Sequence, residues 1–179
     1  MGIPFLVQGV LGLYSSSKYI TPPWGNVLLG AIFLFVFGFG WQAVKGYRRT
    51  VKDFKENKNA AAKGVKEAQN SLGVNYRDGL GVEQDFKEAV KWFEKAADQG
   101  AAMAQDNLGG MYGKGLGVEQ NYVTAYTWAS IAAFNGFEVA KETTSVIAKE
   151  MTSAQIAEAQ KLSKEMAEKN PKLISKQQN

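Results

Sequence analysis

The acidic side chains Glu83, Asp85 and Glu88 come closest, by type and spacing, to a chemical site in this sequence. Carboxylates placed this near one another can bind a divalent cation. However, Asp85 stands directly before a helical pattern, where an aspartate caps the first backbone N–H groups, and the two glutamates suit a solvated acidic surface. We therefore predict a helix cap at this place, and no metal site.

The chain contains neither histidine nor cysteine among its 179 residues. It therefore lacks the commonest general base, the commonest metal and haem ligand, and any thiolate nucleophile. No spacing of the remaining polar side chains indicates a Ser–Lys pair or paired catalytic carboxylates. The string Gly-Leu-Gly-Val lacks the preceding strand and the following lysine of a phosphate-binding loop. The sequence predicts a protein that is not an enzyme and has no cofactor.

A segment of 36 residues occurs twice in tandem, at 68–103 and at 104–139, with 16 identical positions. The string Gly-Leu-Gly-Val-Glu-Gln is the same at 79–84 and at 115–120. Repeats of 20–50 residues are typical of solenoids, in which neighbouring units bury a shared core. Because solenoids present surfaces to partners, the repeat favours a binding function.

Each unit is predicted to be a pair of helices. In the first unit, Leu72 and Tyr76 have helical spacing within 68–77, and the turn at 78–84 is rich in glycine. A second helix at 86–98 ends at Gly100, the usual position of a C-terminal glycine. The mid-helix Gly73 indicates that another helix approaches closely there.

These elements resemble the Sel-one-like repeat family: Ala-x3-Leu-Gly-x2-Tyr, then Gly-Leu-Gly-Val, then Ala-x2-Trp-x3-Ala-Ala-x2-Gly. The resemblance implies an α/α solenoid with a concave face, used by adaptors and scaffolds in membrane-associated assemblies. We assign both tryptophans to the core rather than to a ligand platform. The repeat positions of structural importance are Leu72, Gly73, Tyr76, Gly79, Gly81, Ala89, Trp92 and Gly100, and their equivalents Leu108, Gly109, Tyr112, Gly115, Gly117, Ala125, Trp128 and Gly136.

A degenerate third unit is predicted at 140–170, which closes a repeat domain spanning 67–170. Its two helices are expected at 140–151 and 153–169, and Thr152 with Gln155 matches a capping box. Its polar composition suits the outer face of a terminal repeat. The tail at 171–179 is expected to be mobile from residue 172 onward unless a partner holds it.

A membrane helix is predicted at 21–44, because no charged residue lies between Lys18 and Lys45 and the stretch 27–41 is entirely apolar. A buried helix of a soluble domain is the alternative. Residues 1–20 are predicted to be interfacial or re-entrant, and a second span is possible there. The expected anchor residues are Trp24, Gly30, Phe33, Phe37, Gly38 and Trp41.

A basic connector follows at 45–66, where eight basic and two acidic residues give a net charge of +6. The lipid-headgroup residues are predicted to be Lys45, Arg48, Arg49 and Lys52. A solvated linker helix explains the same pattern equally well. Residues 57–64 are the expected joint. The positive-inside rule places the repeat domain on the cytoplasmic side of a single-pass protein.

The predicted fold class is all-α: an N-terminal transmembrane helix followed by a short α/α solenoid of helix-turn-helix repeats. The favoured function is a membrane-anchored scaffold, an accessory or assembly subunit of an integral membrane protein complex. Its expected partners are that complex, membrane lipids and a soluble protein, but not nucleic acid, because residues 67–179 carry a net charge of −3. A membrane-tethered adaptor is the alternative, and a hydrolase is less favoured.

Overall fold

The computed structural model describes residues 45, 46 and 48–174, and the secondary structure of this part is helical throughout. The chain divides into two compact units, Met1–Lys45 and Gly46–Asn179, and the helices described below belong to the second. Within the described residues, no helix is both long and apolar enough to cross a bilayer. The segments predicted at 1–20 and 21–44, with all six anchor residues, lie outside them.

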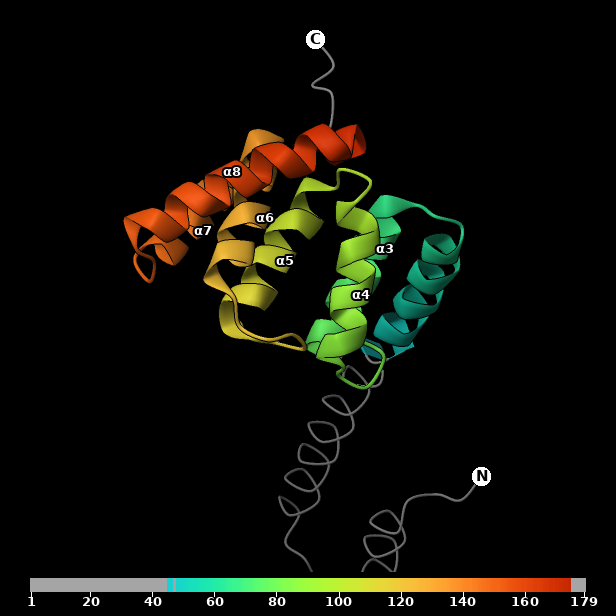
Figure 1. Cartoon of the computed structure of the whole chain (residues 1–179). Helices are drawn as coiled ribbons and strands as arrows, with labels where there is room; N and C mark the ends of the chain where they lie inside the picture. The colour runs from blue at the N-terminus through green and yellow to red at the C-terminus, as the bar shows by residue number, and fades with distance from the viewer. Residues whose placement is uncertain (1–44, 47, 175–179) are drawn as a thin grey trace, which may run out of the picture. The chain divides into compact units, whose positions relative to one another are not determined.

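The prediction of an all-helical solenoid is confirmed for the repeat domain (Figure 1). A helical segment at 48–62 comes first. From α3 to α7, consecutive helices then pack against one another, whereas α8 packs mainly against α6. The elements are α3 (Lys66–Asp78), α4 (Phe86–Ala97), α5 (Ala102–Lys114), α6 (Tyr122–Phe134), α7 (Val139–Ala148), α8 (Ser153–Lys169) and the short 3-10 helix η1 (Pro171–Leu173).

The second helix of each pair begins at a side-chain cap. The Asp85 carboxylate accepts hydrogen bonds from the backbone N–H groups of Lys87 and Glu88, and the Asn121 side chain accepts one from Thr124. Such caps satisfy donors that have no partner within the helix. The predicted role of Asp85 as a helix cap is therefore confirmed.

The second glycine of each turn packs against the start of the second helix of the preceding unit. A Cβ atom on Gly117 would lie 2.5 Å from the Phe86 carbonyl, and one on Gly81 would lie 2.4 Å from the Thr50 carbonyl oxygen. Both glycines also have positive φ angles, of +73° and +77°. These positions therefore serve the contact between successive repeat units as well as the turn.

The helical segment at 48–62 occupies the place of a second helix in a preceding unit. Thr50 stands 36 residues before Phe86, and Ala61 stands 36 before Ala97. The Gln69 side-chain amide donates to the Ala61 carbonyl at 3.2 Å, just as Gln105 donates to Ala97 at 3.2 Å. The described solenoid therefore includes half a repeat before α3.

This packing corrects the expectation of a joint at 57–64. Residues 57–62 continue the helix, and Ala61 is buried. The Asn57 side-chain amide donates to Asn75 on α3 at 2.9 Å, and the Phe54 ring meets the Tyr76 ring edge-on at 5.7 Å. Small polar composition suggested a linker, but the alanines here allow close helix packing.

The core lies between the helix pairs and consists of small and large apolar side chains in alternation. The fully buried alanines let helices approach, and Phe93 fills the space beside Gly73, where a Cβ would lie 2.6 Å from the ring. Burying one side chain of this size contributes about 1.5–3 kcal/mol. The largest buried apolar residues are Leu72, Phe93, Leu108, Met111, Trp128 and Ile131.

The C-terminal part closes the solenoid with α8 and η1. The capping box predicted at Thr152 and Gln155 is confirmed, since both reciprocal hydrogen bonds are present. The expected mobility of the tail was wrong for 172–174, because Leu173 is buried in the core cluster. Gln105 and Asn135 donate to its carbonyl oxygen at 2.8 and 2.7 Å, which fastens the chain end to the second unit. Residues 175–179 lie outside the described part.

Candidate functional site

A groove of about 730 Å³ lies on the face formed by the first helices of the three pairs. It is lined by the end of α3, by α5 and by α7, with the start of α6 at one side. A volume of this size falls within the range of about 300–1,000 Å³ that is usual for ligand sites. We take this groove as our candidate site.

The floor of the groove is the open face of α5. Asp106, Gly110 and Gly113 share that face, because residues three and four apart lie side by side on a helix. A Cβ atom on Gly110 would meet nothing within 4 Å, and one on Gly113 would make only ordinary contacts. The first unit has Val74 and Arg77 at the positions equivalent to Gly110 and Gly113. Only the second unit therefore lacks side chains on this part of its first helix.

The wall opposite is a stripe of apolar and acidic side chains on α7 and the turn that follows it. Val139 and Val146 line the groove with 57% and 55% of their surface exposed. Glu142 and Glu150 line it beside them and are exposed too. Apolar side chains left open within a hollow are typical of a surface that meets a partner.

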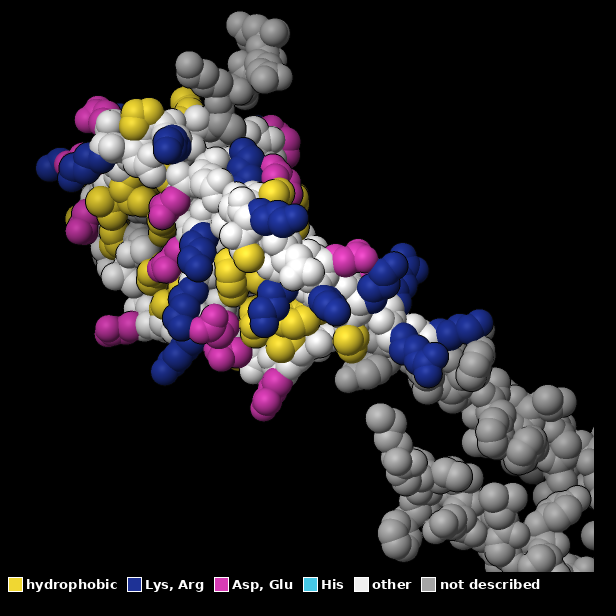
Figure 2. Space-filling view, turned by 90° about the vertical axis from the view of Figure 1, so that its right-hand side faces the viewer, with side chains coloured by type: hydrophobic (Ala, Val, Ile, Leu, Met, Phe, Trp, Pro, Cys, Tyr) yellow, Lys and Arg dark blue, Asp and Glu magenta, His cyan; other side chains and the backbone are white. Residues whose placement is uncertain are grey.

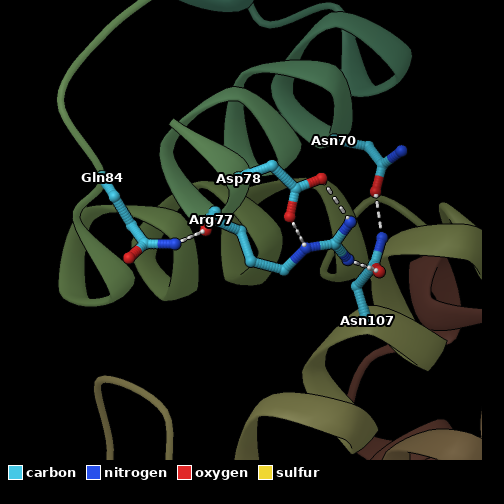
Figure 3. A network of polar contacts seen from close by, with 5 residues as sticks. All are labelled: Asn70, Arg77, Asp78, Gln84 and Asn107. Atoms are coloured by element: carbon cyan, nitrogen blue, oxygen red, sulfur yellow. Dashed lines mark hydrogen bonds and ion pairs between the residues drawn. The ribbon is translucent and has the colours of Figure 1, made fainter. Parts of the chain in front are cut away.

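One end of the groove is closed by a polar network between α3 and α5 (Figure 3). The Arg77 guanidinium donates to the Asp78 carboxylate at 2.7 and 2.9 Å, and to Asn107 at 2.7 Å. Asn107 in turn donates to Asn70 at 3.0 Å. The hydrogen bond from Arg77 holds the pKa of Asp78 below its usual value. The charges of Arg77 and Asp78 therefore neutralise each other within the protein.

Asp106 differs from these residues because its carboxylate is incompletely paired. Its Oδ1 atom is buried and accepts no hydrogen bond from the described residues. Burial raises the pKa of Asp106, and a hydrogen bond from Thr143 partly opposes that rise. A buried carboxylate oxygen without a donor is costly for the folded state.

The predicted repeat positions lie mostly in the core and in the turns of the solenoid. Leu72, Leu108, Ala89 and Ala125 are fully buried. Trp128 is 9% exposed and belongs to the core, whereas Trp92 is half-buried and lies under the Lys95 ammonium at 4.1 Å. The remaining positions lie in the turns or where helices touch: Gly73, Tyr76, Gly79, Gly81, Gly100, Gly109, Tyr112, Gly115, Gly117 and Gly136.

The predicted headgroup residues lie at the N-terminal end of the described part, and all are exposed. Arg49 and Lys52 expose 86% and 75% of their side chains and pair with Asp53 and Glu56 one turn later. Figure 2 shows Lys and Arg side chains gathered at this end of the domain. Arg48 adds to the same basic end, whose residues are not among those lining the groove. Lys45 belongs to the other compact unit.

No group of three or more acidic side chains among the described residues is placed to hold a metal ion. Asp106, Glu142 and Glu150 share the groove with Lys114, but they form no such cluster.

The repeats match a known family in sequence and in structure. The Sel1 repeat pattern matches residues 66–100 and 102–136. The crystal structure of a Sel1 repeat protein from Oxalobacter formigenes is 32% identical, with a TM-score of 0.51, and the match covers 70% of this chain and 92% of that one. The chain belongs to the Sel1 repeat family. The family's repeat domains are generally protein-interaction scaffolds with an all-helical solenoid fold.

A second Sel1-like structure is a much longer protein. It is c5321, a protective antigen present in uropathogenic Escherichia coli strains, whose structure displays the same repeat fold. The match has 38% identity and a TM-score of 0.63, and it covers 67% of this chain but only 26% of that one. Among curated proteins, no sequence matches this Sel1 repeat chain.

Sequence reasoning missed the groove because its residues are departures from the Sel1 repeat. The signals in the sequence were Gly110 and Gly113, which lie within a helix at positions where the first unit has larger side chains. A further signal was the pair Val139 and Val146. Each such glycine makes a helix less stable by about 1 kcal/mol than alanine would. Two of them within one turn indicate that this helix face is required to be free of side chains.

Proposed function

We propose that the protein is a membrane-anchored scaffold, an accessory or assembly subunit of an integral membrane protein complex. The groove carries this proposal: exposed Val139 and Val146 stand over the open floor at Gly110, on a domain of a family that generally binds proteins. Exposed apolar side chains in a hollow favour a protein partner over a small polar ligand.

The anchoring half of the proposal rests on the sequence before the described helices. Residues 21–44 are uncharged and long enough for a span, and the basic side chains that follow suit anionic headgroups. Arg48, Arg49 and Lys52 are exposed on the helical segment at 48–62, each able to contribute about 1 kcal/mol near such a surface. By the positive-inside rule, the repeat domain faces the cytoplasm.

The scaffold proposal is tested by extracting the full chain with a C-terminal tag from membranes in mild detergent. We expect a defined set of integral membrane subunits to co-purify at fixed ratios. Recovery of the chain alone would contradict the scaffold role, and recovery with only a soluble protein would favour the tethered-adaptor alternative. A hydrolytic activity lost on one serine or carboxylate substitution would favour an enzyme.

The side of the membrane is tested with a cysteine at position 175, since the natural sequence has none. In intact cells, the variant Ser175→Cys should be protected from a thiol reagent that does not cross membranes, and it should react once the cells are opened. Labelling in intact cells would place the repeat domain on the other side.

A further inference from the structure

We propose that the groove between α5 and α7 binds an extended segment of the partner protein in which two cationic side chains flank an apolar one. The order along the segment is basic, any residue, apolar, any residue, basic. This rests on the proposed scaffold function and specifies which kind of peptide its groove recognises.

The charges that line the groove select a cationic ligand. Arg77 and Asp78 neutralise each other, as described above. The remaining charged lining residues are three carboxylates, Asp106, Glu142 and Glu150, and one ammonium group, Lys114, which leaves two negative charges in excess. No ion pair with a described residue occupies the two glutamates. A phosphate-bearing ligand such as nucleic acid would be repelled here.

The spacing along α7 sets the spacing in the ligand. Glu142 and Val146 lie four residues apart on α7, and Glu150 follows in the turn after the helix, where its backbone N–H donates to the Ile147 carbonyl at 3.0 Å. At about 1.5 Å per residue in the helix and about 2 Å in such a tight turn, the two carboxylates stand about 12–14 Å apart along the chain. In an extended chain, alternate side chains share a face and each residue rises about 3.3 Å. Cationic residues four positions apart therefore span about 13 Å, and the residue midway faces Val146.

The floor of the groove has room for such a chain. Gly110 offers open space above its Cα atom, so an extended backbone can lie across α5 without meeting a side chain. Asp106 stands one turn before it, with a buried Oδ1 atom that lacks a donor. Because the Asp106 residue as a whole is only partly buried, a guanidinium of the bound segment can pair with the carboxylate from its exposed side.

The test is a binding measurement with the full chain in detergent micelles. The probe is a fluorescein-labelled peptide that contains Arg-Ser-Leu-Ser-Arg between flanking glycines. The control peptide Arg-Leu-Ser-Ser-Arg has the same composition, but its leucine points to the opposite face. We expect the probe to bind at least about tenfold more tightly than the control, since the control loses its apolar contact.

Two variants of the groove should weaken the probe, and two matched variants should not. Gly110→Leu fills open space and should reduce affinity about tenfold or more, as should the double charge reversal Glu142→Lys with Glu150→Lys. Ala154→Leu and the double reversal Glu158→Lys with Glu168→Lys make the corresponding changes at exposed positions of α8 and should leave affinity unchanged. Circular dichroism and gel filtration identify any variant that has not folded.

Three outcomes would overturn the proposal: equal binding of both peptides, undiminished binding to folded Gly110→Leu, or equal effects of the groove and α8 charge reversals. The scaffold proposal is tested separately by co-purification. If membrane subunits co-purify with wild type and Gly110→Leu alike, the scaffold role stands and the groove assignment fails. If neither brings down a subunit, the scaffold role fails.

Discussion

The same substitution, glycine to alanine, should have three different effects at three positions within eight residues of one repeat. Gly110 lies inside α5 and faces open space. Gly115 has a φ of +66° and lies near the Gln120 side chain, at 3.3 Å from an added Cβ. Gly117 has a φ of +73°, and its added Cβ would lie 2.5 Å from the backbone of Phe86. The comparison separates helix propensity, backbone conformation and packing between repeats.

The expected magnitudes follow from these surroundings. Gly110→Ala should raise the free energy of unfolding by about 0.5–1 kcal/mol, because alanine loses less backbone entropy in a helix. Gly115→Ala should lower it by about 1–2 kcal/mol, the cost of a left-handed conformation for a residue with a Cβ. Gly117→Ala adds an overlap with backbone that no side-chain movement relieves, so we expect a loss of about 2–5 kcal/mol in total.

The assay is thermal and urea unfolding of a fragment of residues 46–179, followed by circular dichroism. For a domain of this size, 1 kcal/mol shifts Tm by roughly 3–6 °C, so the three variants should be well resolved. The reasoning would be refuted if Gly117→Ala were no less stable than Gly115→Ala. It would also be refuted if Gly110→Ala lowered Tm, because the space above that residue would then be filled.

Three further perturbations test other parts of the account. A fragment of residues 66–179 should unfold at a clearly lower temperature than 46–179 in circular dichroism, because it loses the half repeat at 48–62; equal Tm values would contradict the packing. Leu173→Ala should cost about 2–5 kcal/mol in urea unfolding, as for other buried leucines, whereas a cost near zero would mean that η1 does not seal the core. Asp106→Asn should unfold at higher temperature than wild type at neutral pH. Burial raises the pKa of Asp106 in the folded state, so wild type loses stability as pH rises above the unfolded pKa of about 3.9. The difference in Tm between the two proteins should therefore disappear below that pH. A difference in Tm that does not change with pH would refute burial of the charged carboxylate as its cause.

The helices and their caps could be predicted because they depend on local sequence. Asp85, the glycine turns and the capping box at Thr152 act on backbone groups a few residues away, and each repeats or follows a known pattern. The role of 48–62 as half a repeat escaped prediction because its sequence shares little with α4. Only contacts distant in sequence, such as Asn57 with Asn75, reveal its place.

The candidate site was harder to predict for the same reason. The groove depends on what α5 and α7 lack relative to the first repeat, and a missing side chain gives no periodic signal. The fastening of Leu173 by Gln105 and Asn135 joins residues that are 68 and 38 positions apart. No pattern in the C-terminal tail indicates those partners, so composition alone suggested mobility.

The central claim is that the full chain holds a membrane complex together through its groove. The most direct measurement is quantitative co-purification of the tagged full chain, comparing wild type with Gly110→Leu and Ala154→Leu at equal expression. We predict that one set of integral membrane subunits accompanies wild type and Ala154→Leu and is depleted about tenfold or more with Gly110→Leu. Recovery of the wild-type chain without any membrane subunit would contradict the account.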